Sequence, residues 1–186
     1  MSLTNPKSIT TKTGDQGMTR LFSGEQVLKT SLRIDAYGDV DEATSILGIA
    51  RHHVRSEENQ TLILFVQKSL SRICAELATT EEKLSRLKAR VDQPFLNELE
   101  VRRERLESQV TIPNGFIVPA GSLAAAHLDH ARTVVRRAER KVVQLLQAKE
   151  ITNGLTLVWL NRLSDLLYLL ARHEEGKPIY VKDDAT

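Results

Sequence analysis

The chain has 186 residues, with 26 Lys and Arg against 24 Asp and Glu, so its formal net charge at pH 7 is only +2. This length suits one well-buried core, and the balanced charge argues against a nucleic-acid binder. No apolar run is long enough to span a bilayer, and the single cysteine, Cys74, suits a reducing compartment such as the cytoplasm.

The N-terminal segment contains a loop with the composition of an anion-binding site, Thr11-Lys-Thr-Gly-Asp-Gln-Gly-Met-Thr-Arg20. Its glycines allow backbone conformations in which successive N–H groups converge on an oxyanion. The alternative at this point is a mobile, mildly basic arm. Cationic and hydroxyl side chains are available for the same ligand: Lys12, Arg20, Lys29, Thr11, Thr13 and Thr19.

Beyond residue 32 the apolar residues follow a helical spacing. A first helix carries its apolar face over Ala36–Ala50, and a second follows over Leu62–Leu77. A charged stretch comes next. Within it, Asp92 can cap a third, solvent-exposed helix that has Pro94 in its first turn.

Two long helices complete the pattern. The fourth begins at Ser122 and runs to about Lys149, and the fifth runs from about Leu155 to His173. Because strand signals are nearly absent, the sequence predicts an all-α, five-helix antiparallel bundle over residues 33–175. With the loop 1–32 before it and the tail 176–186 after it, the whole chain is expected to form one domain.

The fourth helix carries a polar stripe next to its apolar face. Arg137 and Lys141 are expected on the far, wetter side. Guanidinium groups at a core boundary favour anionic partners, because burying them unpaired is costly. The alternative is an ordinary solvated face of Glu/Arg pairs. The stripe falls within roughly 100° of arc and consists of Arg132, Arg136, Glu139 and Arg140.

The fifth helix has a polar stripe although most of its circumference is apolar. Asn161, Asp165, Tyr168 and Arg172 lie within about 60° of one another. Buried polar groups need hydrogen-bond partners, so this stripe is expected to face the stripe of the fourth helix or a ligand held there. A purely structural buried network is the alternative.

Two further features have two interpretations each. On the first helix, a second face with Asp41 at its centre either meets solvent or packs on another subunit, where Asp41 would pair with an arginine. Phe116, in the Pro- and Gly-rich connection 111–121, is either a lid over the core or the wall of a pocket. The second face consists of Tyr37, Asp41, Thr44, Gly48 and Arg51.

Several catalytic motifs are absent from the sequence. The segment 24–30 lacks the second glycine of a P-loop, no Glu-x-x-His pair supports a di-iron bundle, and no Gly-x-Ser-x-Gly motif supplies a nucleophile. The histidines show no zinc-ligand spacing with Cys74. Catalysis is therefore expected to rely on positioning and charge.

Taken together, five segments over residues 9–173 resemble the PduO-type ATP:cob(I)alamin adenosyltransferases. This resemblance implies homotrimers of five-helix, ferritin-like bundles that transfer the 5′-deoxyadenosyl group of ATP to cobalt, release triphosphate and use Mg²⁺. A non-catalytic ATP- or cobalamin-binding module for sensing or delivery is the alternative. The segments are Thr11-Lys-Thr-Gly-Asp-x-Gly-x-Thr, Tyr37-Gly-Asp-Val-Asp-Glu42, Phe116-Ile-Val-Pro-Ala-Gly, Ala131-Arg-Thr-Val-Val-Arg-Arg-Ala-Glu-Arg140 and Asn161-Arg-Leu-Ser-Asp165.

The resemblance also implies roles for particular residues. Asp41 would pair with Arg132 across a subunit interface, and both would be catalytic together with Arg136. Phe116 would be the wall of the cobalamin site and would displace the lower axial base of cob(II)alamin, so that a partner such as a flavin-dependent reductase can reduce it. The implied ATP-binding residues are Thr11, Lys12, Thr13, Gly14, Thr19, Arg20, Lys29, Arg136, Arg137, Glu139, Arg140 and Asn161.

Overall fold

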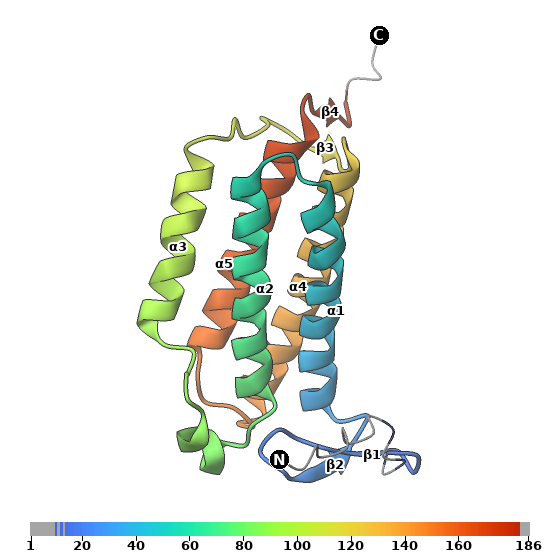
Figure 1. The fold of residues 1–186 in the computed structure, drawn as a ribbon, viewed down its shortest axis with the longest axis vertical. Helices are drawn as coiled ribbons and strands as arrows, with labels where there is room; N and C mark the ends of the chain where they lie inside the picture. Colours follow the sequence, from blue (N-terminus) through green and yellow to red (C-terminus); the bar gives the residue numbers. More distant parts are fainter. Residues whose placement is uncertain (1–9, 11, 13, 183–186) are drawn as a thin grey trace, which may run out of the picture.

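A computed structural model describes residues 10, 12 and 14–182 (Figure 1). Successive long helices run antiparallel, so the predicted all-α bundle is confirmed. A short 3₁₀ helix, η1 (Glu81–Arg86), follows the second of them. The five long helices are α1 (Leu32–His53), α2 (Glu57–Leu77), α3 (Gln93–Glu107), α4 (Leu123–Gln147) and α5 (Leu155–Glu175).

Capping side chains fix where three of these helices begin. Ser56, Asp92 and Ser122 each accept a hydrogen bond from the backbone N–H three residues further on. The start predicted for α3 at Asp92, with Pro94 in the first turn, is confirmed. At the far end of α5, Gly176 has φ of 81°, a backbone conformation that favours glycine.

Helix α4 lies at the centre of the bundle, because α1 and α5 both pack against it. Helix α2 then packs on α1, and α3 packs on α5. The ring of Trp159 in α5 is fully buried and stacks on Phe95 of α3 at a centroid distance of 5.2 Å. The third helix is therefore less exposed than predicted, since it buries Phe95, Leu96, Leu99 and Leu106.

The core is a continuous cluster of hydrophobic side chains from all five long helices. Each Leu, Val or Ile in it stabilises the fold by about 1.5–3 kcal/mol relative to an exposed position. Between α2 and α3, which are not packed closely, lies a groove of about 760 Å³. None of the predicted ATP-binding residues that the structure describes lines this groove.

Two short antiparallel strand pairs lie at opposite ends of the bundle (Figure 1). One joins β1 (Met18–Arg20) to β2 (Gln26–Leu28) beneath α1, and the other joins β3 (Ile117–Val118) to β4 (Ile179–Tyr180). The residue pattern does not predict these strands, because two or three residues are too few to show an alternation of apolar and polar side chains. In the part of the chain that the structure describes, no helix is long and apolar enough to cross a membrane.

A buried arginine ties together the end of the bundle that carries β1 and β2. Arg33, in the first turn of α1, donates hydrogen bonds to the carbonyls of Leu77 and Thr79 at the end of α2. It also donates to the carbonyl of Glu150, after α4. Because these carbonyls at helix ends have no partner within their own helix, the guanidinium satisfies them and joins three elements.

Candidate active site

The β1–β2 hairpin holds the described part of the predicted anion loop. The N–H of Lys29 donates to the carbonyl of Gly17 at 2.9 Å, and the N–H of Gly17 donates to the carbonyl of Gly14 at 3.2 Å. The Lys29 ammonium lies over Gly14, where an added Cβ would be only 3.0 Å from Nζ. Glycine at position 14 thus lets a cation approach the backbone of this loop.

The structure also describes Lys12, Thr19 and Arg20 of the predicted site. Lys12 is exposed, with φ of 57°, and its carbonyl accepts from the N–H of Asp15. Thr19 and Arg20 lie on β1, where the exposed guanidinium of Arg20 donates to the carbonyl of Gly24 at 3.4 Å. Thr11 and Thr13 lie outside the described residues.

Arg136 and Arg140 are exposed one turn apart on α4. Arg140 donates to the backbone carbonyl of Arg136 at 2.9 Å. Among the described residues, neither guanidinium forms an ion pair with a carboxylate. Two positive groups without an anionic partner among the described residues form a surface that can bind a polyanion.

Glu139 and Asn161 connect the polar stripes of α4 and α5, as predicted. The Asn161 amide donates to the Glu139 carboxylate at 3.2 Å, and both side chains are half-buried. A second link joins Arg172 to Asp129 at 2.6 Å, deep in the bundle. Asp165 does not take part, because it is exposed and faces Arg162 of its own helix.

Arg137 and Lys141 do not point to the wetter side of α4, so that prediction was wrong. Arg137 Nε lies 3.1 Å from Asp39 Oδ1, and Lys141 Nζ lies 2.9 Å from Asp39 Oδ2. Arg137 also pairs with Glu42. The reason is that α1 packs against this side of α4 and brings two carboxylates to it.

These contacts stabilise the charge on Arg137. Desolvation disfavours that charge, but the carboxylates of Asp39 and Glu42 outweigh it and raise the pKa of the guanidinium. The sequence carried a signal for this network that was missed. Asp39 and Glu42 lie three residues apart on α1, and Arg137 and Lys141 lie four residues apart on α4. Acids and bases at these spacings can face each other when the two helices pack antiparallel.

The second face of α1 was expected to meet solvent or another subunit, and part of it does neither. The Gln67 amide of α2 donates to the carbonyl of Thr44 at 3.0 Å, and it lies 3.3 Å from the position of a Cβ on Gly48. Asp41 on this face is exposed.

The thiol of Cys74 on α2 is protonated at neutral pH. Burial, with a contribution from the Asp41 charge, raises the pKa of this thiol to about 12.

Arg132 and Asp41 are not paired within one chain. The Nε of Arg132 instead lies 3.1 Å from Asp129 Oδ1, one turn earlier on α4. Since Asp129 also holds the buried Arg172, Arg132 belongs to a network at the core boundary. Pairing of Asp41 with Arg132 of a neighbouring subunit stays a prediction.

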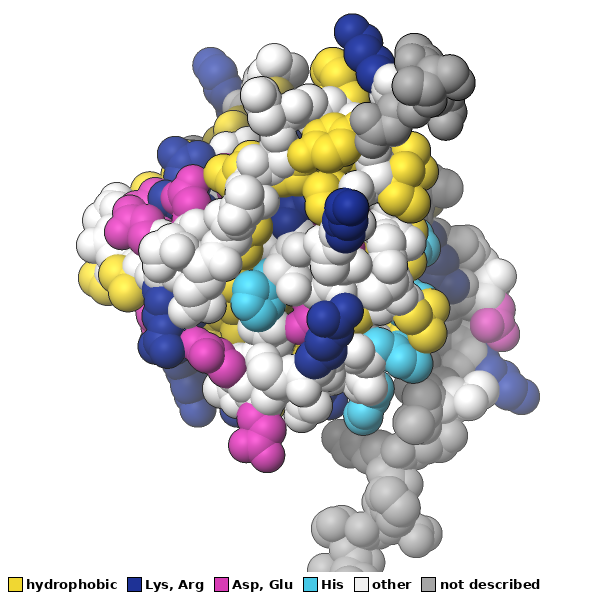
Figure 2. All heavy atoms as spheres, turned by 90° about the horizontal axis from the view of Figure 1, so that it is seen from above, with side chains coloured by type: hydrophobic (Ala, Val, Ile, Leu, Met, Phe, Trp, Pro, Cys, Tyr) yellow, Lys and Arg dark blue, Asp and Glu magenta, His cyan; other side chains and the backbone are white. Residues whose placement is uncertain are grey.

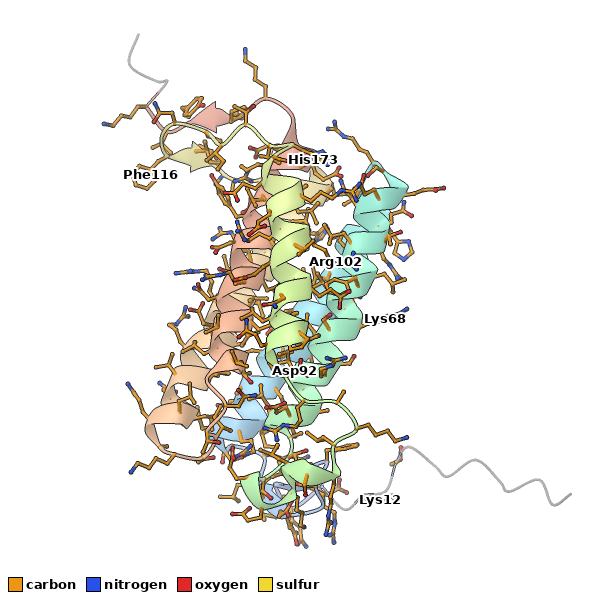
Figure 3. All side chains as sticks on the ribbon, turned by 90° about the vertical axis from the view of Figure 1, so that its left-hand side faces the viewer. Lys12, Lys68, Asp92, Arg102, Phe116 and His173 are labelled. Atoms are coloured by element: carbon orange, nitrogen blue, oxygen red, sulfur yellow. The ribbon has the colours of Figure 1, made fainter. Side chains whose placement is uncertain are left out.

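Phe116 is 88% exposed, so it is not a lid over the core. It lies at the end of the bundle opposite to Lys12 (Figure 3). Viewed from above, that end face gathers hydrophobic side chains (Figure 2). The exposed apolar residues of the β3–β4 region and the start of α4 are Phe116, Val118, Leu123, Ile179 and Val181.

Comparison with known proteins identifies the family. The family profile described as cobalamin adenosyltransferase matches residues 9–174, and the chain belongs to this family. It is 38% identical over 169 residues to the corrinoid adenosyltransferase PduO of Salmonella typhimurium, an alignment that covers 91% of this chain and 50% of that protein. A corrinoid adenosyltransferase of Citrobacter freundii is 37% identical over 170 residues, covering 91% of this chain and 96% of the relative.

The fold is shared with solved structures of the same kind. A phenylalanine-to-alanine variant of the PduO-type ATP:corrinoid adenosyltransferase from Lactobacillus reuteri, complexed with cobalamin and ATP, has a TM-score of 0.84 and 31% identity. The match covers 95% of this chain and 100% of that one. The chain thus spans about half the length of the Salmonella relative and the full length of the Lactobacillus structure.

Proposed function

We propose that the protein transfers the 5′-deoxyadenosyl group of ATP to the cobalt of cob(I)alamin, giving adenosylcobalamin and triphosphate. The observation that carries this proposal is the pair of guanidiniums of Arg136 and Arg140, which have no carboxylate partner among the described residues and lie at the level of the first half of α1. The anion loop and Lys29 precede α1, at the end of the bundle where α1 begins (Figure 1). The polyanion is taken to be ATP because the similar PduO-type ATP:corrinoid adenosyltransferase was solved as a complex with cobalamin and ATP.

The chemistry requires no nucleophile from the protein. The lone pair of cobalt(I) attacks C5′ of ATP, the Co–C bond forms, and the C5′–O bond breaks with its electron pair leaving on triphosphate. Arg136, Arg140 and Lys29 would stabilise the charge that develops on this leaving group, and the loop N–H groups would orient it. The protonated Cys74 is not needed in any step.

Mg²⁺ would enter this site with ATP. Among the described residues, no group of three or more His, Cys, Asp or Glu side chains could hold a metal ion. Mg²⁺ in phosphoryl sites commonly takes its ligands from substrate phosphates and water, with only one or two carboxylates. A metal bound mainly through the triphosphate would not need such a cluster of protein ligands.

The separation of Phe116 from the phosphate-binding groups supports a site shared between chains. From Leu123 to Arg136, α4 alone spans roughly 20 Å. Yet C5′ is joined to the triphosphate through a single oxygen, so the cobalt must stand close to it. We therefore propose an oligomer in which Phe116 of one chain acts on the site that another chain's arginines and loop provide. The family resemblance favours a homotrimer.

In this arrangement Phe116 would be the apolar wall of the cobalamin site. Its ring would occupy the place of the lower axial base, which leaves cob(II)alamin four-coordinate and easier to reduce. The electron would come from a separate donor, and a flavin-dependent reductase is a candidate. We also propose that residues 1–186 work as one domain in the cytoplasm, which the single cysteine favours.

Anaerobic mixing of the protein with ATP, Mg²⁺ and chemically reduced cobalamin tests the proposed reaction. We expect the absorbance spectrum to change to that of adenosylcobalamin, with one triphosphate released per product. Omitting ATP is the control and should give no change. A protein that binds both substrates without any spectral change would instead be a non-catalytic binding or delivery module.

A further inference from the structure

The turn of the β1–β2 hairpin is bound to the connection between α2 and η1. The N–H of Ser23 donates to the carbonyl of Ala78 at 3.3 Å, and the N–H of Thr80 donates back to Ser23 Oγ at 3.2 Å. The Thr80 hydroxyl also donates to Glu25 Oε1 at 3.4 Å. These bonds join segments more than fifty residues apart in the chain.

An ion pair closes the same contact. Lys83 of η1 pairs with the carboxylate of Glu25 and donates to the carbonyl of Ser23 at 3.1 Å. The two charged side chains are only about one-third exposed, at 32% and 29%. Hydrogen bonds from Lys83 and then Ser23 lower the pKa of Glu25 to about 2, so this carboxylate stays ionised at all physiological pH values.

The contact lies shortly before Lys29 in the sequence, and Lys29 is the cation that lies over the anion loop. Glu25 is followed by β2, and Lys29 comes directly after that strand. The N–H of Lys29 donates a hydrogen bond to the carbonyl of Gly17, and its ammonium lies over Gly14. A pair of three-residue strands is marginal by itself, so its position on the bundle depends on contacts such as these.

We propose that Glu25 and Lys83 are positioning residues for the nucleotide, because they dock the hairpin so that Lys29 and the loop at Gly14 are in place before ATP binds. This inference rests on the proposed function. The ion pair does not touch the triphosphate; it reduces the ordering that ATP must otherwise impose on the loop. Its loss should therefore weaken ATP binding without slowing the chemical step.

The variant Lys83→Met tests this role, with Lys88→Met as the matched control on an exposed lysine nearby. Removing a partly exposed ion pair with its hydrogen bond should raise KM for ATP roughly three- to tenfold. We expect kcat at saturating ATP, KM for cobalamin and Tm to stay near wild-type values. Glu25→Gln should raise KM for ATP as well, and Lys83→Arg should retain wild-type behaviour.

Combining the two changes gives a second readout. If the residues act only through each other, Lys83→Met with Glu25→Gln should weaken ATP binding no more than either change alone. Unchanged KM for ATP in Lys83→Met, or an equal rise in Lys88→Met, would overturn the proposal. An equilibrium titration of each variant with ATP measures the same effect without turnover, so the proposal can fail or hold independently of the adenosyltransfer reaction.

Discussion

Replacing Arg136 with alanine is expected to lower kcat/KM for ATP by roughly 10²–10³-fold, the loss typical of one preorganised group that stabilises transition-state charge. The guanidinium is exposed and, among the described residues, has no carboxylate partner, so its removal leaves no buried group unsatisfied. Tm should therefore stay unchanged. Steady-state kinetics on the anaerobic spectral assay measures the effect.

Two further variants make this result specific. Arg105→Ala removes an exposed arginine of α3, on the other side of the bundle, and should leave kcat/KM near the wild-type value. Arg136→Lys keeps the charge but loses the planar fork, so its kcat/KM should fall between those of wild type and alanine. If Arg136→Ala turned over as fast as wild type, the polar stripe of α4 would be merely structural.

Replacing Phe116 with alanine is expected to impair turnover that starts from cob(II)alamin much more than turnover from pre-reduced cob(I)alamin. The reason is that the ring would act before the transfer, by keeping the lower axial base off the cobalt. The ratio of the two rates should fall about tenfold or more, which corresponds to 1.36 kcal/mol or more of lost stabilisation. Parallel assays with the two cobalt oxidation states measure it.

Phe22→Ala is the matched control for this experiment. Phe22 is another highly exposed phenylalanine, 74% exposed, but it lies in the turn of the β1–β2 hairpin at the other end of the bundle. Its removal should leave the ratio of the two rates unchanged. Equal losses with cob(II)alamin and cob(I)alamin in Phe116→Ala would contradict the role of the ring as a wall.

Helices were the part of the fold that sequence reasoning predicted best. Their apolar residues repeat with the helical period over many turns, and residues such as Asp92 and Pro94 mark a start by local hydrogen bonding and geometry. The strands of two and three residues gave no such repeat. Their pairing is decided by contacts between distant segments, as for Ile117 and Tyr180.

The site shows the same division between local and tertiary information. A helical wheel correctly placed Asn161 opposite the polar stripe of α4, because most of the remaining circumference of α5 is apolar and must be buried. It failed for Arg137, since a wheel shows the direction of a side chain but not which helix lies there. It also could not show that Phe116 and Lys12 lie at opposite ends (Figure 3).

A crystal structure of the protein with ATP and Mg²⁺ tests the central claim most directly. The account predicts that the triphosphate contacts Arg136, Arg140 and Lys29 together with the N–H groups near Gly14. It also predicts that the ring of Phe116 from a neighbouring chain faces the open side of C5′. Nucleotide bound elsewhere, with these arginines and the lysine still without an anion, would contradict the account.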